Sequence, residues 1–84
     1  MNEKVFVALC KREVVDYVNH HLVGNKITED DVYVVWLCKT LQNSKALLST
    51  TIADGMYYEL TYNGSHCELY VDAYKKVDNF TVVV

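Results

Sequence analysis

The sequence contains no proline, only three glycines, and eight basic residues against eleven acidic ones. Without proline-rich, serine-rich or low-complexity stretches, it offers no candidate linker between domains. We therefore expect its 84 residues to form one domain, close to the lower size limit for a self-sufficient hydrophobic core. The net charge of −3 argues against general binding of nucleic acid, because binding to a phosphate backbone needs clustered lysine and arginine.

Cysteine is also scarce: Cys10, Cys38 and Cys67 are the three in the sequence, and they are widely spaced. An odd number at such spacing argues against a disulfide framework and for a reducing compartment. The longest apolar run, Val32–Cys38, is far too short to span a bilayer. The first residues, MNEKVF, mix acid and base, unlike a secretory leader. These features predict a cytoplasmic protein that makes no membrane contact.

Motifs that carry known chemistry are missing as well. The sequence has no glycine-rich phosphate loop, no GxSxG and no HExxH. His20 and His21 are neighbours on a predicted helix, so they point about 100° apart and only one of them can join a given metal site. His66 precedes Cys67, and successive residues of a strand point to opposite faces, which excludes a nucleophilic pair. We expect no enzyme, no metal and no cofactor.

One amphipathic stretch, residues 3–22, opens the chain and predicts an α-helix. Its core-facing residues recur at steps of three and four, the period of a helix face: Phe6, Leu9, Cys10, Val14, Tyr17, Val18 and Leu22. Gly24-Asn25 follows and is a plausible helix stop. The helix is long enough to cover one side of a small sheet.

From residue 31 onward, valine, tyrosine, tryptophan, threonine and isoleucine dominate, and these residues favour strands. We predict strands over residues 31–41, 45–52, 56–63 and 65–75, and leave open a short fifth strand over 80–84. A helix over 31–41 capped by Thr28 is the less favoured alternative, because that stretch is rich in β-branched residues. The predicted fold is α+β: one N-terminal helix packed on one face of a four- to five-stranded antiparallel meander.

The last predicted hairpin is the most informative part of the sequence. Asn63-Gly64 favours a two-residue type I′ turn, because both positions tolerate a positive φ. This turn sets Tyr57 opposite Tyr70 and Glu59 opposite Glu68 on one face. Facing carboxylates are unusual in a sheet, so we expect water or a nearby lysine to offset their repulsion.

The two earlier turns decide which side chains face the helix. A three-residue loop at 53–55 with Gly55 in the left-handed region keeps one apolar face continuous. A three-residue loop at 42–44 buries Val32, Val34, Trp36 and Cys38, whereas a two-residue loop buries Tyr33, Val35 and Leu37. The first alternative is favoured because it leaves Lys39 outside. Cys38 and Cys67 are then both expected on the core face.

A single helix of about 20 residues covers only one side of such a sheet. The other side is expected to carry tyrosines beside charged groups. The expected binding or interface residues are Tyr33, Lys45, Tyr57, Glu59, Glu68, Tyr70, Tyr74 and Lys75. Three interpretations stay open: ordinary half-exposed tyrosines, a homodimer interface, or a site for a foreign protein or a nucleotide stacked on the rings. A hydrolase that uses Glu59, Glu68 or Asp72 is the enzymatic alternative.

Strings such as CKTLQN, KALLSTT, DGMYYE and DAYKK, within residues 27–76, resemble a family of short proteins of unknown function from temperate phages and prophages of Gram-positive bacteria. The helical VVDYVNHHL is also similar, whereas VDNFTVVV departs from the pattern. The resemblance brings no activity and no functional residues, but it implies a phage accessory protein in an infected bacterial cytoplasm. The leading hypothesis is a binding protein that inhibits an antiphage defence system by occupying a protein or sequestering a nucleotide signal. The alternative is a homo-oligomer, most simply a dimer, acting in phage development.

Overall fold

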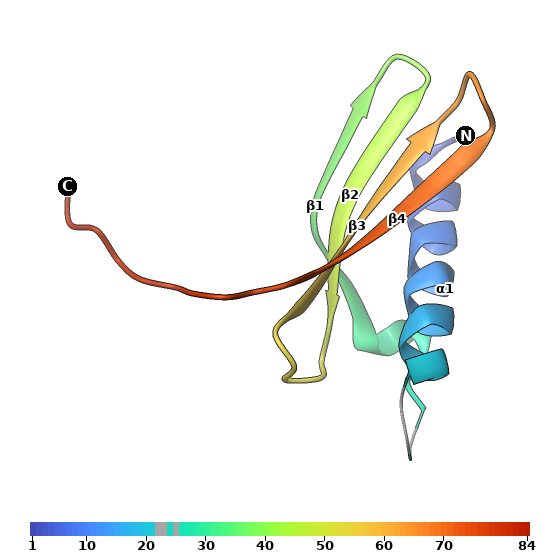
Figure 1. Ribbon diagram of the computed structural model, residues 1–84. Coiled ribbons are helices and arrows are strands. Elements are labelled where there is room, and N and C mark those ends of the chain that lie inside the picture. The colour runs from blue at the N-terminus through green and yellow to red at the C-terminus, as the bar shows by residue number, and fades with distance from the viewer. Residues whose placement is uncertain (22–23, 25) are drawn as a thin grey trace.

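The computed structural model describes residues 1–21, 24 and 26–84. In chain order its elements are helix α1 (Glu3–His21), the 3-10 turn η1 (Glu29–Asp31) and the strands β1 (Val32–Thr40), β2 (Asn43–Thr50), β3 (Met56–Asn63) and β4 (Glu68–Lys75). The strands form one antiparallel sheet in the order β1-β2-β3-β4, and α1 lies along one side of it (Figure 1). The predicted α+β fold is confirmed. Leu22, the expected last helical residue, and Asn25 of the expected stop lie outside the described residues.

Helix α1 packs on the sheet through a narrow stripe of side chains at every fourth position. The buried members of the stripe are Phe6, Cys10, Val14 and Val18. They meet the buried sheet residues Ala46, Leu48, Tyr58 and Leu60 to form the core. Tyr17, expected in the stripe, lies at its margin and is 37% exposed. Its ring contacts that of Tyr58 edge-on, with the centroids 5.6 Å apart, so it closes one side of the core.

The connection from α1 to the sheet is held by the side chain of Asn19. Its Nδ2 donates to the Ile27 carbonyl at 2.9 Å and its Oδ1 accepts from the Ile27 N–H at 2.8 Å. Thr28 then precedes η1, where its N–H donates to Asp31 Oδ2 at 2.9 Å. The alternative of a helix over 31–41 capped by Thr28 is wrong, because η1 has only three residues and β1 follows it directly.

A bulge in β1 decides which of its side chains face α1. The turn to β2 has two residues, since Thr40 pairs with Asn43, but Val35 is an extra residue between Val34 and Trp36. The extra residue reverses the alternation of side chains along the strand. On the side of α1 lie Val32, Val34 and Leu37, and on the opposite side lie Tyr33, Trp36 and Cys38. The expectation that Trp36 and Cys38 face the core is therefore wrong.

The β2–β3 connection spans residues 51–55 and is longer than the expected three residues. Leu48 therefore pairs with Tyr58 rather than with Leu60. Gly55 has φ 72°, which confirms the left-handed position predicted for it. Because the register differs by two residues, an even number, each residue keeps its predicted face.

The β3–β4 connection has four residues, 64–67, instead of the expected two-residue turn at Asn63-Gly64. The predicted register is wrong: Tyr57 faces Tyr74 and Glu59 faces Asp72. The shift of four residues is also even, so the tyrosines and carboxylates stay on the side opposite α1. Cys67 lies in the loop with φ 51° and is exposed, so its expected place in the core is wrong.

Contacts between the two hairpin tips explain the longer β3–β4 loop. The Gly64 N–H donates to Asn43 Oδ1 at 3.2 Å, and Gln42 Nε2 donates to Ser65 Oγ at 2.8 Å. Within the loop, Asn63 Oδ1 accepts from the Ser65 N–H at 3.0 Å. The loop is therefore shaped by the neighbouring β1–β2 turn as well as by its own residues.

We expect Gly64→Ala to lower the free energy of unfolding by about 1–3 kcal/mol, the usual cost of forcing extra volume into a packed site. A Cβ at this position would clash with the Gln42 carbonyl oxygen, so the two tips would have to separate. Urea unfolding measures the change. Ser65→Ala is the matched control, because it removes one exposed hydrogen bond without adding volume and should cost less. Equal stability of Gly64→Ala and the parent chain would contradict the contact between the tips.

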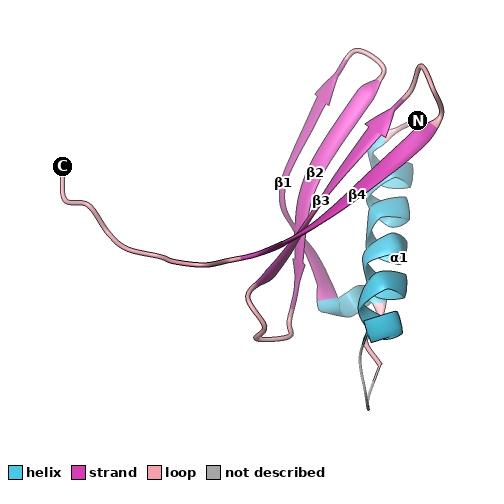
Figure 2. Cartoon of the chain, in the orientation of Figure 1, coloured by secondary structure: helices cyan, strands magenta, loops and turns pink. Residues whose placement is uncertain are grey.

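Residues 76–84, here called the extended segment, form no helix or strand and run away from the sheet (Figures 1 and 2). The strand left open over 80–84 is therefore not formed. The Lys76 N–H donates to the Gly55 carbonyl at 2.7 Å, which continues the pairing of β3 and β4 by one residue beyond the start of β3. Beyond this bond the extended segment is exposed at every residue.

Candidate binding surface

The side of the sheet opposite α1, here called the open face, arranges its side chains in rows that cross the strands. One row contains Cys38, Lys45, Thr61 and Tyr70; the next contains Trp36, Leu47, Glu59 and Asp72. In a third row Tyr33 pairs with Ser49, and Tyr57 pairs with Tyr74. The rows follow directly from strand pairing, because directly opposite residues point to the same face.

The centre of the open face holds an ion pair beside a second carboxylate. Lys45 Nζ lies 3.5 Å from Glu59 Oε1, and Glu59 faces Asp72 on the next strand. The expectation that a lysine offsets facing carboxylates is thus confirmed for Lys45, although the facing residue is Asp72 and not Glu68. One lysine stands against two carboxylates here, so this part of the face is acidic.

A hollow of about 360 Å³ adjoins this ion pair and is lined by Trp36, Cys38, Lys45, Glu59 and Thr61, among others. Trp36 is 41% exposed beside it. Sequence reasoning placed both Trp36 and Cys38 in the core and so missed them. A signal was available, since an unbroken apolar run such as Val32–Cys38 supplies apolar side chains to both faces of a strand in any register.

Tyrosines surround this centre on three strands. Tyr33, Tyr70 and Tyr74 are 48%, 44% and 52% exposed, and Tyr57 is half-buried. Partial desolvation, followed by a hydrogen bond to the Glu68 carboxylate, raises the pKa of Tyr70. Glu68 begins β4 and lies opposite Asn63, at the edge of the face nearest the loop. These five residues were predicted for the open face.

Lys75 does not join the predicted set. Lys75 pairs with Met56. The next pair along the two strands, Tyr57 and Tyr74, points to the open face, so Lys75 and Met56 point to the α1 side of the sheet. A phosphate held by Lys75 would therefore be separated from the tyrosine rings by the thickness of the sheet. This placement removes one support for nucleotide stacking on the open face.

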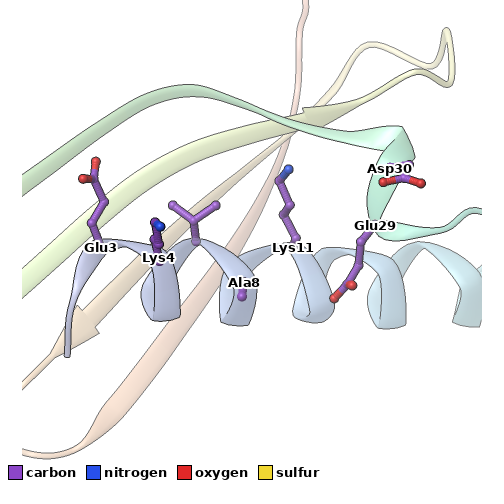
Figure 3. Close-up of a pocket in the computed structure, with 7 residues that line it drawn as sticks. Glu3, Lys4, Ala8, Lys11, Glu29 and Asp30 are labelled. Carbon is purple, nitrogen blue, oxygen red and sulfur yellow. The ribbon is translucent and has the colours of Figure 1, made fainter.

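A second hollow, of about 490 Å³, lies between α1 and η1 (Figure 3). Lys4 and Lys11 from α1 line it together with Glu29 and Asp30 from η1. Because charges of both signs are interspersed, the hollow favours neither a cation nor an anion. It is a weaker candidate than the open face.

The histidines are distributed over two separate places. His20 and His21 are exposed on the last turn of α1 with ring centroids 5.3 Å apart. His66 and Cys67 lie in the β3–β4 loop, so the prediction that they alternate along a strand is wrong. Over residues 1–21, 24 and 26–84, no three histidine, cysteine or acidic side chains gather as metal ligands. Over the same residues, no helix combines the length and the apolar character needed to cross a bilayer.

The fold and the open face define a small α+β protein whose helix covers one side of a four-stranded meander and leaves an aromatic side uncovered. The chain belongs to a family of unknown function, DUF6275, which matches residues 7–84. The predicted membership in a family of unknown function is confirmed, and the match continues through the extended segment. No curated protein and no solved structure matches the chain.

Proposed function

We propose that this protein is a non-enzymatic binding protein and that its open face binds another protein. The observation that carries the proposal is the exposure of Trp36, Tyr33, Tyr70 and Tyr74, which are 41–52% exposed on one uncovered face. Tryptophan and tyrosine are enriched at protein interfaces and at their energetic centres. Complete burial of a large apolar side chain contributes about 1.5–3 kcal/mol, and a partner on this face would gain the part of that contribution that belongs to the 41–52% still exposed on each of the four residues.

The charges of the open face favour a protein over a phosphate-bearing ligand. Its lysine, Lys45, is already paired with Glu59, and the carboxylates of Asp72 and Glu68 share the face. An acidic centre surrounded by aromatic groups is complementary to a partner that combines apolar and basic side chains. A nucleotide would meet carboxylates where its phosphates need cations.

The finer proposal is that the partner belongs to a bacterial antiphage defence system, and that the protein inhibits it in the cytoplasm of an infected cell. The support is the resemblance of CKTLQN, KALLSTT and DGMYYE to phage and prophage proteins. A small acidic protein whose sequence carries no known catalytic motif is suited to inhibition by occupying a surface. Plaque formation by a defence-sensitive phage, with and without expression of this protein, across a panel of defence systems tests the proposal. Unchanged plaque counts for every system in the panel would contradict it.

We expect Trp36→Ser and Tyr70→Ser to abolish the rescue of plaques while shifting the free energy of unfolding by only about 1 kcal/mol, because both residues lie on the uncovered face and outside the core, 41% and 44% exposed. Binding of the purified inhibited component should weaken about 30-fold or more for each variant, the effect of losing a hot-spot residue of about 2 kcal/mol. Val5→Ser, at a 51% exposed site on α1, is the matched control and should keep both activities. Full rescue by both open-face variants would place the binding surface elsewhere.

A further inference from the structure

The extended segment exposes large apolar side chains to an unusual degree. Val77 is 96% exposed, Phe80 78%, Val82 68% and Val83 94%. Apart from Asp78 and Asn79, residues 77–84 are the β-branched or aromatic types that favour strands. Such side chains gain free energy when they leave water, and no other part of the described chain covers them. The segment therefore has the composition of a strand that lacks a neighbouring strand.

Strand β4 offers the complementary surface. It is an edge of the sheet, so its outward backbone groups pair with no strand of the described chain, and seven of its eight residues are exposed. Helix α1 leaves the adjacent side of β4 open, where Val71 is 40% exposed. The edge carries neither proline nor a bulge, which are two of the devices that prevent a further strand from adding to a sheet, although it does carry the charged residues Glu68, Asp72 and Lys75.

We propose that two copies of this chain exchange their extended segments, and that residues 77–84 of each copy add as an antiparallel fifth strand to the outer edge of β4 in the other. Residues 77–84 of the segment number eight, and β4 also has eight residues. The segment runs on from the end of β4 and then curves away (Figure 1); in the exchanged dimer residues 68–84 would straighten into one stretch with residue 76 at its middle. We place a two-fold axis at Lys76, so that the two stretches run antiparallel. Residues 77–84 of each copy then lie along β4 of the other copy.

The chemistry of the facing residues agrees with this symmetric register. On the α1 side Leu69 would face the second copy's Val83, and on the open face Tyr70 would face the second copy's Val82. Pairs of aromatic and β-branched residues are among the favourable cross-strand pairs. The two Lys76 residues would meet at the axis. Asp78 of each chain is two residues further along on the same face, so its carboxylate would lie near these two positive charges. The pairing uses the edge of the sheet and is independent of a partner on the open face.

The mass of the full chain in solution tests the exchange. We expect a dimer whose dissociation constant rises about 100-fold in Val82→Asp, because a carboxylate would then lie against Tyr70 in a covered strand pair. Val5→Asp, which adds the same charge at an exposed site of α1, should remain dimeric. A monomeric parent chain at every concentration would overturn the proposal, since a segment folded back on its own β4 leaves the mass unchanged.

A disulfide experiment separates strand exchange from any other dimer. In a background with the exposed Cys38 and Cys67 replaced by serine, one copy carries Tyr70→Cys and a differently tagged copy carries Val82→Cys. Oxidation of the mixture should link the two tags, whereas Tyr33→Cys on the opposite edge strand should not link to Val82→Cys. Two results for a dimer would overturn the exchange. In one, Tyr33→Cys links to Val82→Cys as well as Tyr70→Cys does; in the other, neither variant links to Val82→Cys.

Discussion

Replacing Leu48 by alanine should lower the free energy of unfolding by about 2–5 kcal/mol, the range for deleting a fully buried leucine side chain. Leu48 is 0% exposed on β2, between Val34 of β1 and Tyr58 of β3, on the side that α1 covers. The lost side chain would leave a cavity beneath α1 that the rigid neighbouring strands cannot fill. Proteins of ordinary stability have about 5–15 kcal/mol in total, so the variant should lose a large fraction of its stability.

Urea or thermal unfolding followed by circular dichroism measures this effect. Leu41→Ala is the matched control, since Leu41 is 85% exposed in the β1–β2 turn. That substitution should change the free energy of unfolding by less than about 0.5 kcal/mol. If the two variants were equally stable, the packing of α1 against the centre of the sheet would be contradicted.

Stability should also fall as the pH rises from 9 toward 12. Burial, with a smaller effect of the Glu13 carboxylate, raises the pKa of the Cys10 thiol from 9.0 to about 12. Between these values the unfolded chain has released a proton that the folded chain still holds, so each rise in pH favours unfolding. The contribution of the protonated Cys10 thiol to the free energy of unfolding is fully present below pH 9. Above pH 9 it is lost at up to about 1.4 kcal/mol per pH unit. Burial likewise raises the pKa of Tyr58, which acts in the same direction.

Urea unfolding at a series of pH values from neutral to strongly alkaline tests this prediction. Cys10→Ala should flatten the decline, leaving the part that belongs to the raised pKa values of Tyr58 and Tyr70. Cys38→Ala removes an exposed thiol and should keep the full decline. The same slope in Cys10→Ala as in the parent chain would show that this thiol does not control alkaline unfolding.

The proposed strand exchange would also enlarge the proposed binding surface. In the symmetric register the second copy's Phe80 and Val82 would lie on the open face, beside Asp72 and Tyr70. A dimer would then present one aromatic surface that extends across two copies. The two proposals can still fail separately, because Val82→Asp acts on the mass of the protein and Trp36→Ser acts on binding to a different part of the face.

Most of the predicted binding residues do lie on one surface, because the errors in the predicted strand registers are even numbers of residues. Tyr57, Glu59, Tyr70 and Tyr74 keep their face because both predicted hairpin registers differ from the structure by even numbers of residues. Lys75 was grouped with the tyrosines from its neighbouring position in the sequence. It lies on the other side of the sheet because adjacent strand residues alternate.

Helical periodicity, β-propensity and alternation act over a few neighbouring residues, so they suffice to predict α1, the four strands and the side of the sheet on which the tyrosines lie. The bulge at Val35, which turns Trp36 outward, and the hydrogen bond from Gly64 to Asn43 beside the β1–β2 turn depend instead on contacts between strands. Both depend on residues about 10 to 20 positions apart in the chain, whose contacts appear only once the strands are paired. The bond from Lys76 to Gly55, at the start of the extended segment, was decided in the same way by the tertiary structure.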